Sequence, residues 1–328
     1  MTKNGNFKRR VRARAAKTGE SYSSALMQVR RSGQDKTDPP GKTVRLAVAQ
    51  TTVCDDPRDI DAIRAAGLEI RQIIKEAHDV NARLVQFPEG AICAPNKRLM
   101  SAEGPGKVGP SDWGRYDWNI MSRELQEIRI LAKDLGLWIV LGSAHQLTHP
   151  RRPYNSLYVI SDQGKLVTRY DERMLSNTKI SFMYSPGSAP VTFAIDGVRF
   201  GCTLGMEAHY PEIFIEYEQR DVDCVLFSTT GASPAFASEM VGHAASNDYW
   251  TSYSVDADPR LSSPSGIATP GGQWAARASS DGVPGIAVAD ITNNPGSLAR
   301  PWRRTARGGL YEPHLVDDDP RSDCRDMF

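Results

Sequence analysis

The chain has 328 residues, of which 40% are hydrophobic, and this is enough for one large globular domain or two ordinary ones. No stretch approaches the roughly eighteen apolar residues that a membrane span needs, and the basic N-terminus leads into no apolar signal region. The five cysteines are scattered without CxxC spacing, which indicates neither a disulfide framework nor a zinc site. We therefore expect a cytoplasmic protein that does not associate with membranes, and the sequence selects no cofactor.

The formal net charge of +1 is unevenly distributed. Residues 1–42 contain eleven Lys or Arg against three Asp or Glu, a net of +8, which leaves −7 on the rest of the chain. This basic arm ends in a linker of Pro and Gly, which favours a domain boundary near Lys42. Within the arm, TGESYSSALMQVRR predicts a short helix capped by Thr18. We favour a solvated, partly disordered tail over an arm that binds nucleic acid or an acidic partner.

From Val44 onward, short apolar runs alternate with longer amphipathic segments, which predicts strands and helices in one α/β body. The predicted elements are first a strand over 44–51, a helix within 57–79, a strand over 82–89, a helix over 118–135 and a strand over 137–147. Two hairpins follow, one in 155–170 and one in 190–204, each with a turn signal at its centre. The last elements are a helix over 206–219, a strand over 224–230, a helix over 236–250 and four shorter strands.

This order of elements favours two sheets packed face to face with helices outside, rather than a single doubly wound sheet, because helices cluster between pairs of strands. The pattern GxxxxGK[ST] does not occur, and the one match to GxGxxG, GPGKVG at 104–109, does not directly follow a predicted strand, so nucleotide binding has little support.

Polar residues at the predicted strand ends are the candidates for chemistry, because α/β proteins expose reactive groups in the loops that follow strands. The positions that stand out are Glu89, His145, Glu172 and Gly205, with Glu207 and His209 just beyond the last of them. A charged residue at a strand end is usually a solvated cap, so only the convergence of several ends indicates a site.

The segments FPEGAI, GSAH with PYNSL, YDERML, and GCTLGMEAHYPEIF resemble, in order and spacing, the nitrilase or carbon-nitrogen hydrolase superfamily. The resemblance covers about residues 44–302, nearly the whole main body. It implies a four-layer α-β-β-α sandwich, an α/β fold with two packed sheets and outer helices, over residues 43–300. It also implies a site in which a cysteine attacks a nitrile or amide carbon, a glutamate acts as general base, and a lysine stabilises the developing charge.

Carried over residue by residue, the resemblance assigns Glu89 in FPEG as the family glutamate. The other two positions are substituted: YDERML has Glu172 where the family has lysine, and MEAHYPE fixes the cysteine position as Gly205. A second family glutamate corresponds to His145. The residues that we predict to bind substrate are His145, Tyr154, Asn155, Met206, Glu207 and His209.

Two neighbours could replace the missing groups. Cys202 lies three residues before Gly205, but an odd offset in a strand points its side chain to the opposite face. Lys179 lies seven residues beyond Glu172, and it could take the lysine role only if the intervening loop bends sharply.

Without the family ammonium, Glu89 and Glu172 would face each other, and like charge would raise one pKa to give a protonated acid beside an ionised base. The preferred interpretation is therefore non-covalent acid/base chemistry on a small molecule that carries an amine, amide or amidine group. The alternatives are a catalytically dead pseudoenzyme that binds a small molecule or serves as a complex subunit, and an inactivated variant of an amide or nitrile hydrolase. The two carboxylates with His145 or His209 could also bind a divalent metal, although nothing in the spacing selects it.

The resemblance further implies a homodimer or higher homo-oligomer, formed through the helix after the cysteine strand, here PEIFIEYEQR. Ile213, Phe214 and Tyr217 lie on one face of that helix, which is compatible with a half-buried position. Residues 301–328 are charged and weakly periodic, so we expect this C-terminal extension to pack on the domain or on a partner subunit.

Overall fold

The structure is a computed structural model that describes residues 3–19, 21–22, 24–25, 41–231, 233–261, 263–294, 297, 299–316 and 319–323. It has two compact units, one made of residues 1–41 with 294–298 and the other of residues 42–293 with 299–328. Each unit is described by itself below.

The smaller unit contains helix α1, Lys3–Thr18, in which Val11 is buried together with Ala25. Thr18 does not cap the predicted short helix, because it is the last residue of α1 and its hydroxyl donates back to the Arg14 carbonyl at 2.9 Å. Residues 22, 24 and 25 of the predicted helix are helical. Residues 26–31 of that predicted helix lie outside the described residues.

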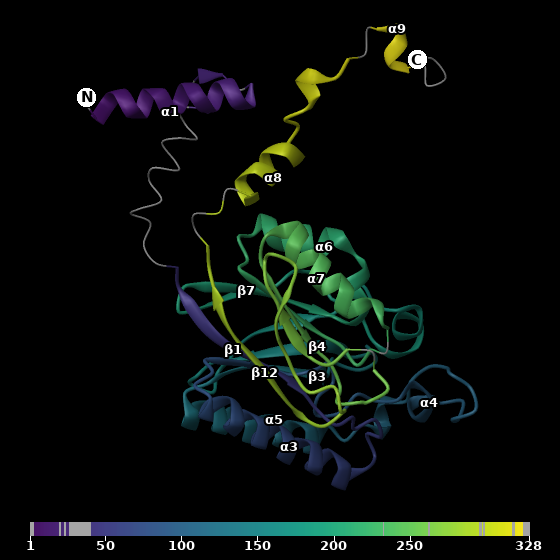
Figure 1. The fold of residues 1–328 in the computed structure, drawn as a ribbon. Coiled ribbons are helices and arrows are strands. Elements are labelled where there is room, and N and C mark those ends of the chain that lie inside the picture. The colour runs from purple at the N-terminus through teal and green to yellow at the C-terminus, as the bar shows by residue number, and fades with distance from the viewer. Residues whose placement is uncertain are drawn as a thin grey trace. The chain divides into compact units, whose positions relative to one another are not determined.

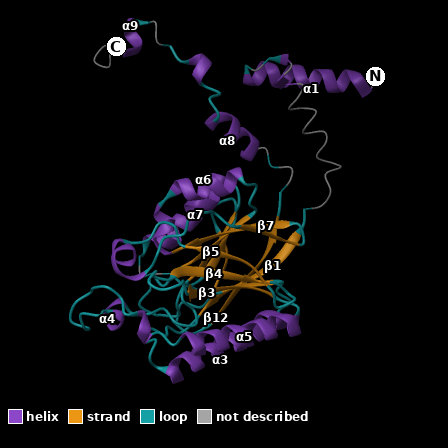
Figure 2. Ribbon diagram, turned by 180° about the vertical axis from the view of Figure 1, so that it is seen from behind, coloured by secondary structure: helices purple, strands orange, loops and turns teal. Residues whose placement is uncertain are grey.

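The larger unit is built on two six-stranded mixed sheets (Figure 2). The first sheet has the order β12-β1-β2-β3-β4-β5, with β1 Thr43–Gln50, β2 Leu84–Gln86, β3 Trp138–His145, β4 Tyr154–Ile160, β5 Leu166–Asp171 and β12 Gly285–Thr292. The second has the order β11-β10-β9-β8-β7-β6, with β6 Thr192–Ile195, β7 Val198–Leu204, β8 Cys224–Ser228, β9 Trp250–Ser254, β10 Gly266–Ala268 and β11 Trp274–Arg277. Strands β1, β2 and β3 run parallel in one sheet, as do β7, β8 and β9 in the other.

Helices cover the outer face of each sheet, which gives four layers (Figure 1). Helices α3, Ile60–Asp79, and α5, Trp118–Leu135, lie on the first sheet, and α6, Pro211–Gln219, and α7, Ala235–Asn247, lie on the second. The other helical segments are α4 Lys97–Met100, η1 Trp113–Arg115, η2 Lys179–Met183, η3 Gly205–His209, α8 Ala299–Arg307, η4 Glu312–His314 and α9 Pro320–Asp323. The predicted α-β-β-α sandwich is confirmed.

Apolar side chains between the sheets form the central layer of the core. Val48 and Val140 from the first sheet meet Phe200 and Leu204 from the second, all of them fully buried. Burial of such side chains contributes roughly 1.5–3 kcal/mol each. Several polar contacts cross this layer as well, and in one of them the Gln86 amide donates to the Phe227 carbonyl at 2.8 Å. This contact holds the end of β2 against the end of β8.

Local sequence signals account for most element boundaries. Asp117 caps α5 by accepting hydrogen bonds from the Asn119 and Ile120 amides, and the helix ends at Gly136 in the left-handed conformation. Asp196 has a φ of 49° and is followed by Gly197, which forms the predicted turn between β6 and β7.

One predicted helix, over 206–219, is divided in two. Residues 205–209 form the 3₁₀ turn η3, and α6 begins only at Pro211. Proline favours the first position of a helix because it has no N–H to donate to a preceding turn.

The C-terminal extension contacts the second sheet's outer layer. Glu218 of α6 is fully buried, and it accepts hydrogen bonds from Arg304 at 3.0 Å and from Arg307 at 2.9 Å. The helix α8 is therefore held against α6, the helix through which the resemblance implies dimerisation. Among the residues that the structure describes, no helix is long and apolar enough to cross a membrane.

Candidate active site

Glu89 lies in the loop after β2 and is 6% exposed. The loop passes directly over β3, and a Cβ atom on Gly142 would lie 2.1 Å from the Pro88 carbonyl oxygen. Only a residue without a side chain permits this approach. Gly142 therefore allows the backbone around Glu89 to lie against β3.

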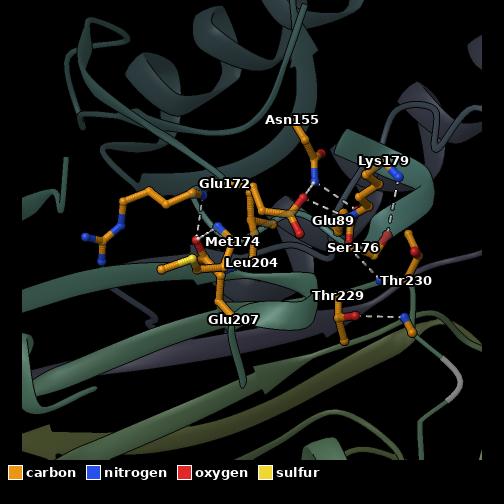
Figure 3. Close-up of polar contacts among 12 residues, drawn as sticks. Glu89, Asn155, Glu172, Met174, Ser176, Lys179, Leu204, Glu207, Thr229 and Thr230 are labelled. Atoms are coloured by element: carbon orange, nitrogen blue, oxygen red, sulfur yellow. Dashed lines mark hydrogen bonds and ion pairs between the residues drawn. The ribbon is translucent and has the colours of Figure 1, made fainter. Parts of the chain in front are cut away.

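The Lys179 ammonium lies between the two carboxylates Glu89 and Glu172 (Figure 3). Its Nζ is 2.5 Å from Oε1 of Glu89 and 2.8 Å from Oε2 of Glu172. The Asn155 amide donates to the same two oxygen atoms, at 2.9 Å and 2.5 Å. The four side chains thus form one network of charge-assisted hydrogen bonds.

The segment after Glu172 bends sharply enough to bring Lys179 back into the site. Ile180 donates its amide hydrogen to the Ser176 carbonyl at 2.9 Å, and Tyr184 donates to the Lys179 carbonyl at 2.9 Å, five residues back. This π-type turn is rare and often occurs at functional sites. The expectation that the ammonium is lost from the site is therefore wrong, since a lysine from a different position supplies it.

Gly205 has a φ of 54°, in the left-handed region that favours glycine. A Cβ atom on Gly205 would lie 2.7 Å from Oε1 of Glu172 and 3.0 Å from Nζ of Lys179. Glu172 and Lys179 therefore occupy the space that a side chain at position 205 would need.

The environment favours a proton on Glu172. Burial raises the pKa of Glu172 to about 8, and the charges of Glu89 and Glu207 add to this shift although Lys179 opposes it. Oε1 of Glu172 has no hydrogen-bond partner among the described residues. Burial alone would lower the pKa of Lys179, but the carboxylates of Glu172 and Glu89 raise it above its usual value.

Glu207 is buried as well, but its contacts are all with the fold. It accepts hydrogen bonds from the Tyr170 hydroxyl at 2.6 Å and from the Leu204, Arg173 and Met174 amides at 2.8, 2.6 and 3.2 Å. These contacts join the end of β5 to the end of β7.

Four other predicted substrate-binding residues, His145, Tyr154, Met206 and His209, also lie away from the cavity beside Glu89. Nδ1 of His145 and the Tyr158 hydroxyl form a hydrogen bond at 2.7 Å, and the His145 ring stacks on Tyr154. His209 contacts Glu239 at 2.6 Å. Tyr154, Met206 and Glu207 do not line the cavity either, whereas Asn155 does. The reason is the alternation of side chains along a strand: Ala144 faces the cavity, so His145 faces away.

The cavity has a volume of about 460 Å³, which suits a small molecule. Glu89, Lys179 and Asn155 line it, together with Thr230 after β8 and Asp256 after β9. The full set of charged lining residues is Asp55, Glu89, Asp256, Asp258, Lys97, Lys179 and Arg260. Asp256 was missed from the sequence, although it stands near the end of a predicted strand, WTSYSVDA, the same signal that identified Glu89.

Cys93 also lines the cavity, but its thiol is fully buried. Contact with Cys54 and burial raise the pKa of Cys93, which opposes formation of the reactive thiolate. Cys202 lies between the two sheets, and burial raises its pKa also. Within the described parts of the chain, no group of three or more His, Cys, Asp or Glu side chains could hold a metal ion.

The model of the carbon-nitrogen hydrolase family matches residues 45–300. Among solved structures, a mutant of the Nesterenkonia AN1 amidase from the nitrilase superfamily is 17% identical, with a TM-score of 0.65 over 85% of this chain and 100% of that chain. A mutant of the same amidase in complex with butyramide is 18% identical, with a TM-score of 0.64 over 85% of this chain and 100% of that chain.

A third structure of that amidase shows covalent addition of the acetamide moiety of fluoroacetamide at the active-site cysteine. It is 17% identical and has a TM-score of 0.65 over 84% of this chain and 98% of that chain. At these identities, the three structures show a shared fold.

Proposed function

The chain belongs to the carbon-nitrogen hydrolase family, and we propose that it acts on a small amide, amidine or amine by acid/base chemistry without a covalent intermediate. The observation that carries the proposal is the polar cavity whose wall includes both Glu89 and the Lys179 ammonium, at a site where position 205 has no side chain. An abandoned site is free to fill with apolar side chains, whereas this cavity has kept a base and a cation side by side.

The reaction that fits these groups best is direct attack by water. Glu89 accepts a proton from a water molecule as that water attacks the carbonyl or amidine carbon. The Lys179 ammonium stabilises the negative charge that develops on the carbonyl oxygen. Glu89 then returns the proton to the departing nitrogen, so that an amide and water give a carboxylic acid and an amine or ammonia.

Glu172 and Asn155 form hydrogen bonds with these two groups. Glu172 contacts Lys179 and does not line the cavity, so it holds the ammonium in place rather than meeting the substrate. This modifies the acid role that the sequence suggested for Glu172, because the proton donor nearest the cavity is on Lys179.

The test is ammonia release from a panel of small amides and amidines that includes butyramide. We expect Glu89→Gln to lower kcat by about 10²-fold or more, as removal of a general base does. Cys93→Ser is the matched control, since it also lines the cavity, and its activity should stay close to that of the wild type. An acylated protein in intact mass spectra, or loss of activity in the Cys93 variant, would contradict the proposal.

A second candidate is a pseudoenzyme that binds a small molecule without converting it. The observation in its favour is that Glu172 and Lys179 fill the space beside Gly205, so their hydrogen bonds satisfy each other. Binding of an amide that depends on Glu89 with no product from any substrate would favour this candidate.

The third interpretation, an inactivated hydrolase, has its own test. The change Glu172→Lys with Gly205→Cys rebuilds the residues that the resemblance implies, and Lys179→Ser must accompany it to free the space at position 205. Recovered amidase activity would indicate a recently inactivated site. Its absence would indicate that the surroundings have also diverged.

A further inference from the structure

Asp256 is a buried carboxylate that faces the cavity and has no partner in the described part of the chain. It follows β9, lines the cavity and is 9% exposed. Its side chain makes no hydrogen bond and no ion pair with any residue that the structure describes. A charged group this deep ordinarily has a partner, because removal of a carboxylate from water costs several kcal/mol.

The other carboxylates of the cavity wall have partners. Glu89 contacts Lys179, Asp258 forms an ion pair with Arg260 at 2.6 Å, and Asp55 accepts a hydrogen bond from Asn96 at 2.9 Å. Asp256 is an acid of the same cavity wall, and it differs from these three in having no hydrogen-bond or ion-pair partner among the described residues.

None of the positively charged residues that line the cavity forms an ion pair with Asp256. Lys179 is committed to Glu89 and Glu172, and Arg260 contacts Asp258 with a side chain that is 89% exposed. Lys97 is exposed as well. Asp256 thus offers the cavity an acceptor that no donor among the described residues bonds.

The electrostatics agree with this geometry. Burial raises the pKa of Asp256 to about 8, and the charges of Glu89 and Asp258 add to the shift. A positively charged ligand bound next to Asp256 would favour its ionised form. Such a ligand would be the partner that the described part of the protein does not provide.

We propose that Asp256 binds an ammonium group of the substrate, so that the protein selects amides or amidines that carry a second, positively charged nitrogen. The inference rests on the proposed function, which places the reacting carbon at Glu89 and Lys179. It adds the substrate class: an amino-substituted amide rather than a neutral or acidic one.

The experiment is calorimetric titration with two matched sets of compounds. One set is 3-aminopropionamide, 4-aminobutyramide and 5-aminopentanamide, and the other is the unsubstituted amides of the same lengths. We expect at least one amino amide to bind about tenfold or more tightly than its neutral counterpart, a difference that one charged contact can supply. Three lengths are used so that one of them spans the distance between the reacting group and Asp256.

The variant Asp256→Asn should reduce that preference to less than about twofold, because it keeps the shape and removes the charge. The matched control is Asp55→Asn, an acid of the same cavity wall that already has a partner, and it should keep the preference. A second variant, Asp256→Ala, guards against misfolding of the first, and circular dichroism checks both.

Equal affinity for the two sets in the wild type, no binding of any amino amide, or a preference that survives in both Asp256 variants would overturn the inference. Failure of the proposed function has a different result. Binding that depends on Asp256 without product formation would leave this inference intact and remove the catalytic proposal, whereas turnover without a preference for amino amides would do the reverse.

Discussion

Glu172 and Glu207 are two fully buried glutamates near the ends of β5 and β7, and burial raises the pKa of both. Glu207 accepts four hydrogen bonds from the surrounding chain, three of them from backbone amides. Glu172 uses one oxygen atom for Lys179 and Asn155, and its other oxygen has no partner among the described residues.

The difference between them separates a structural acid from an acid of the site. Burial alone does not mark function, since both side chains are equally buried. What differs is whether both oxygen atoms of the carboxylate have hydrogen-bond partners. A buried polar atom without a partner in a native structure calls for an explanation. The following predictions test that distinction, from the largest expected effect to the smallest.

The change Glu207→Gln should lower the free energy of unfolding by about 3 kcal/mol, because its amide would point a donor at backbone or hydroxyl donors. Urea denaturation at neutral pH measures the loss. Glu172→Gln is the matched control, and it should cost less than about 1 kcal/mol because Glu172 favours its protonated form and has a spare oxygen. Equal losses in the two variants would contradict the comparison.

The change Lys179→Met should lower the free energy of unfolding by about 2 kcal/mol, since it removes the cation between Glu89 and Glu172. The same substitution in a Glu172→Gln background should cost less, because one of the two acidic side chains that the ammonium contacts is then absent. A double-mutant cycle gives the coupling between Lys179 and Glu172 directly. Strict additivity would show that the ammonium does not stabilise Glu172.

Stability should also depend on pH in a direction that Glu172 sets. Its pKa is raised from 4.5 to about 8 in the folded protein, so between these values the folded state holds a proton that the unfolded state has lost. The free energy of unfolding therefore falls as pH rises through this window, by at most about 1.4 kcal/mol per pH unit for each such group.

Urea denaturation at several pH values across the window measures this slope. Glu172→Gln should make it shallower, and Asp256→Asn should do the same because the pKa of Asp256 is also raised to about 8. A slope that is unchanged in both variants would mean that neither side chain holds its proton in the folded state.

The change Gly205→Ala should destabilise the protein by about 1 kcal/mol more than Gly136→Ala. Both glycines have a positive φ, 54° and 64°, but a Cβ at position 136 meets no atom within 4 Å while one at position 205 meets Glu172 at 2.7 Å. The difference between the two melting curves isolates the contact from the backbone strain. Equal losses would show that the site yields readily around position 205.

The sequence predicted the fold well because the signals for it are local. The period of apolar residues and the Asp117 cap mark α5, and the Asp-Gly pair marks the turn between β6 and β7. For the helix predicted over 206–219, Pro211 indicated that the helix begins later. The prediction gave more weight to the apolar pattern.

The site was predicted less completely, for two physical reasons. Glu89 and Asn155 lie at strand ends whose place in the sheet follows from the family resemblance, and both line the cavity. Lys179 reaches the site through a π-type turn, which the periodicity of apolar residues does not predict. For His145 the signal was available, since the alternation of side chains along β3 separates it from Ala144.

The close approach of the Glu89 loop to Gly142 also bears on how tolerant this protein is of mutation. In a scan of every single substitution, positions with a chemical role are expected to tolerate few replacements. Position 142 has no such role, yet even alanine there would place a carbon 2.1 Å from the Pro88 carbonyl oxygen and displace the loop. A map of tolerated substitutions would therefore show Gly142 to be as intolerant as Glu89. From that map alone, Gly142 would be counted among the catalytic residues, although it has only a structural role.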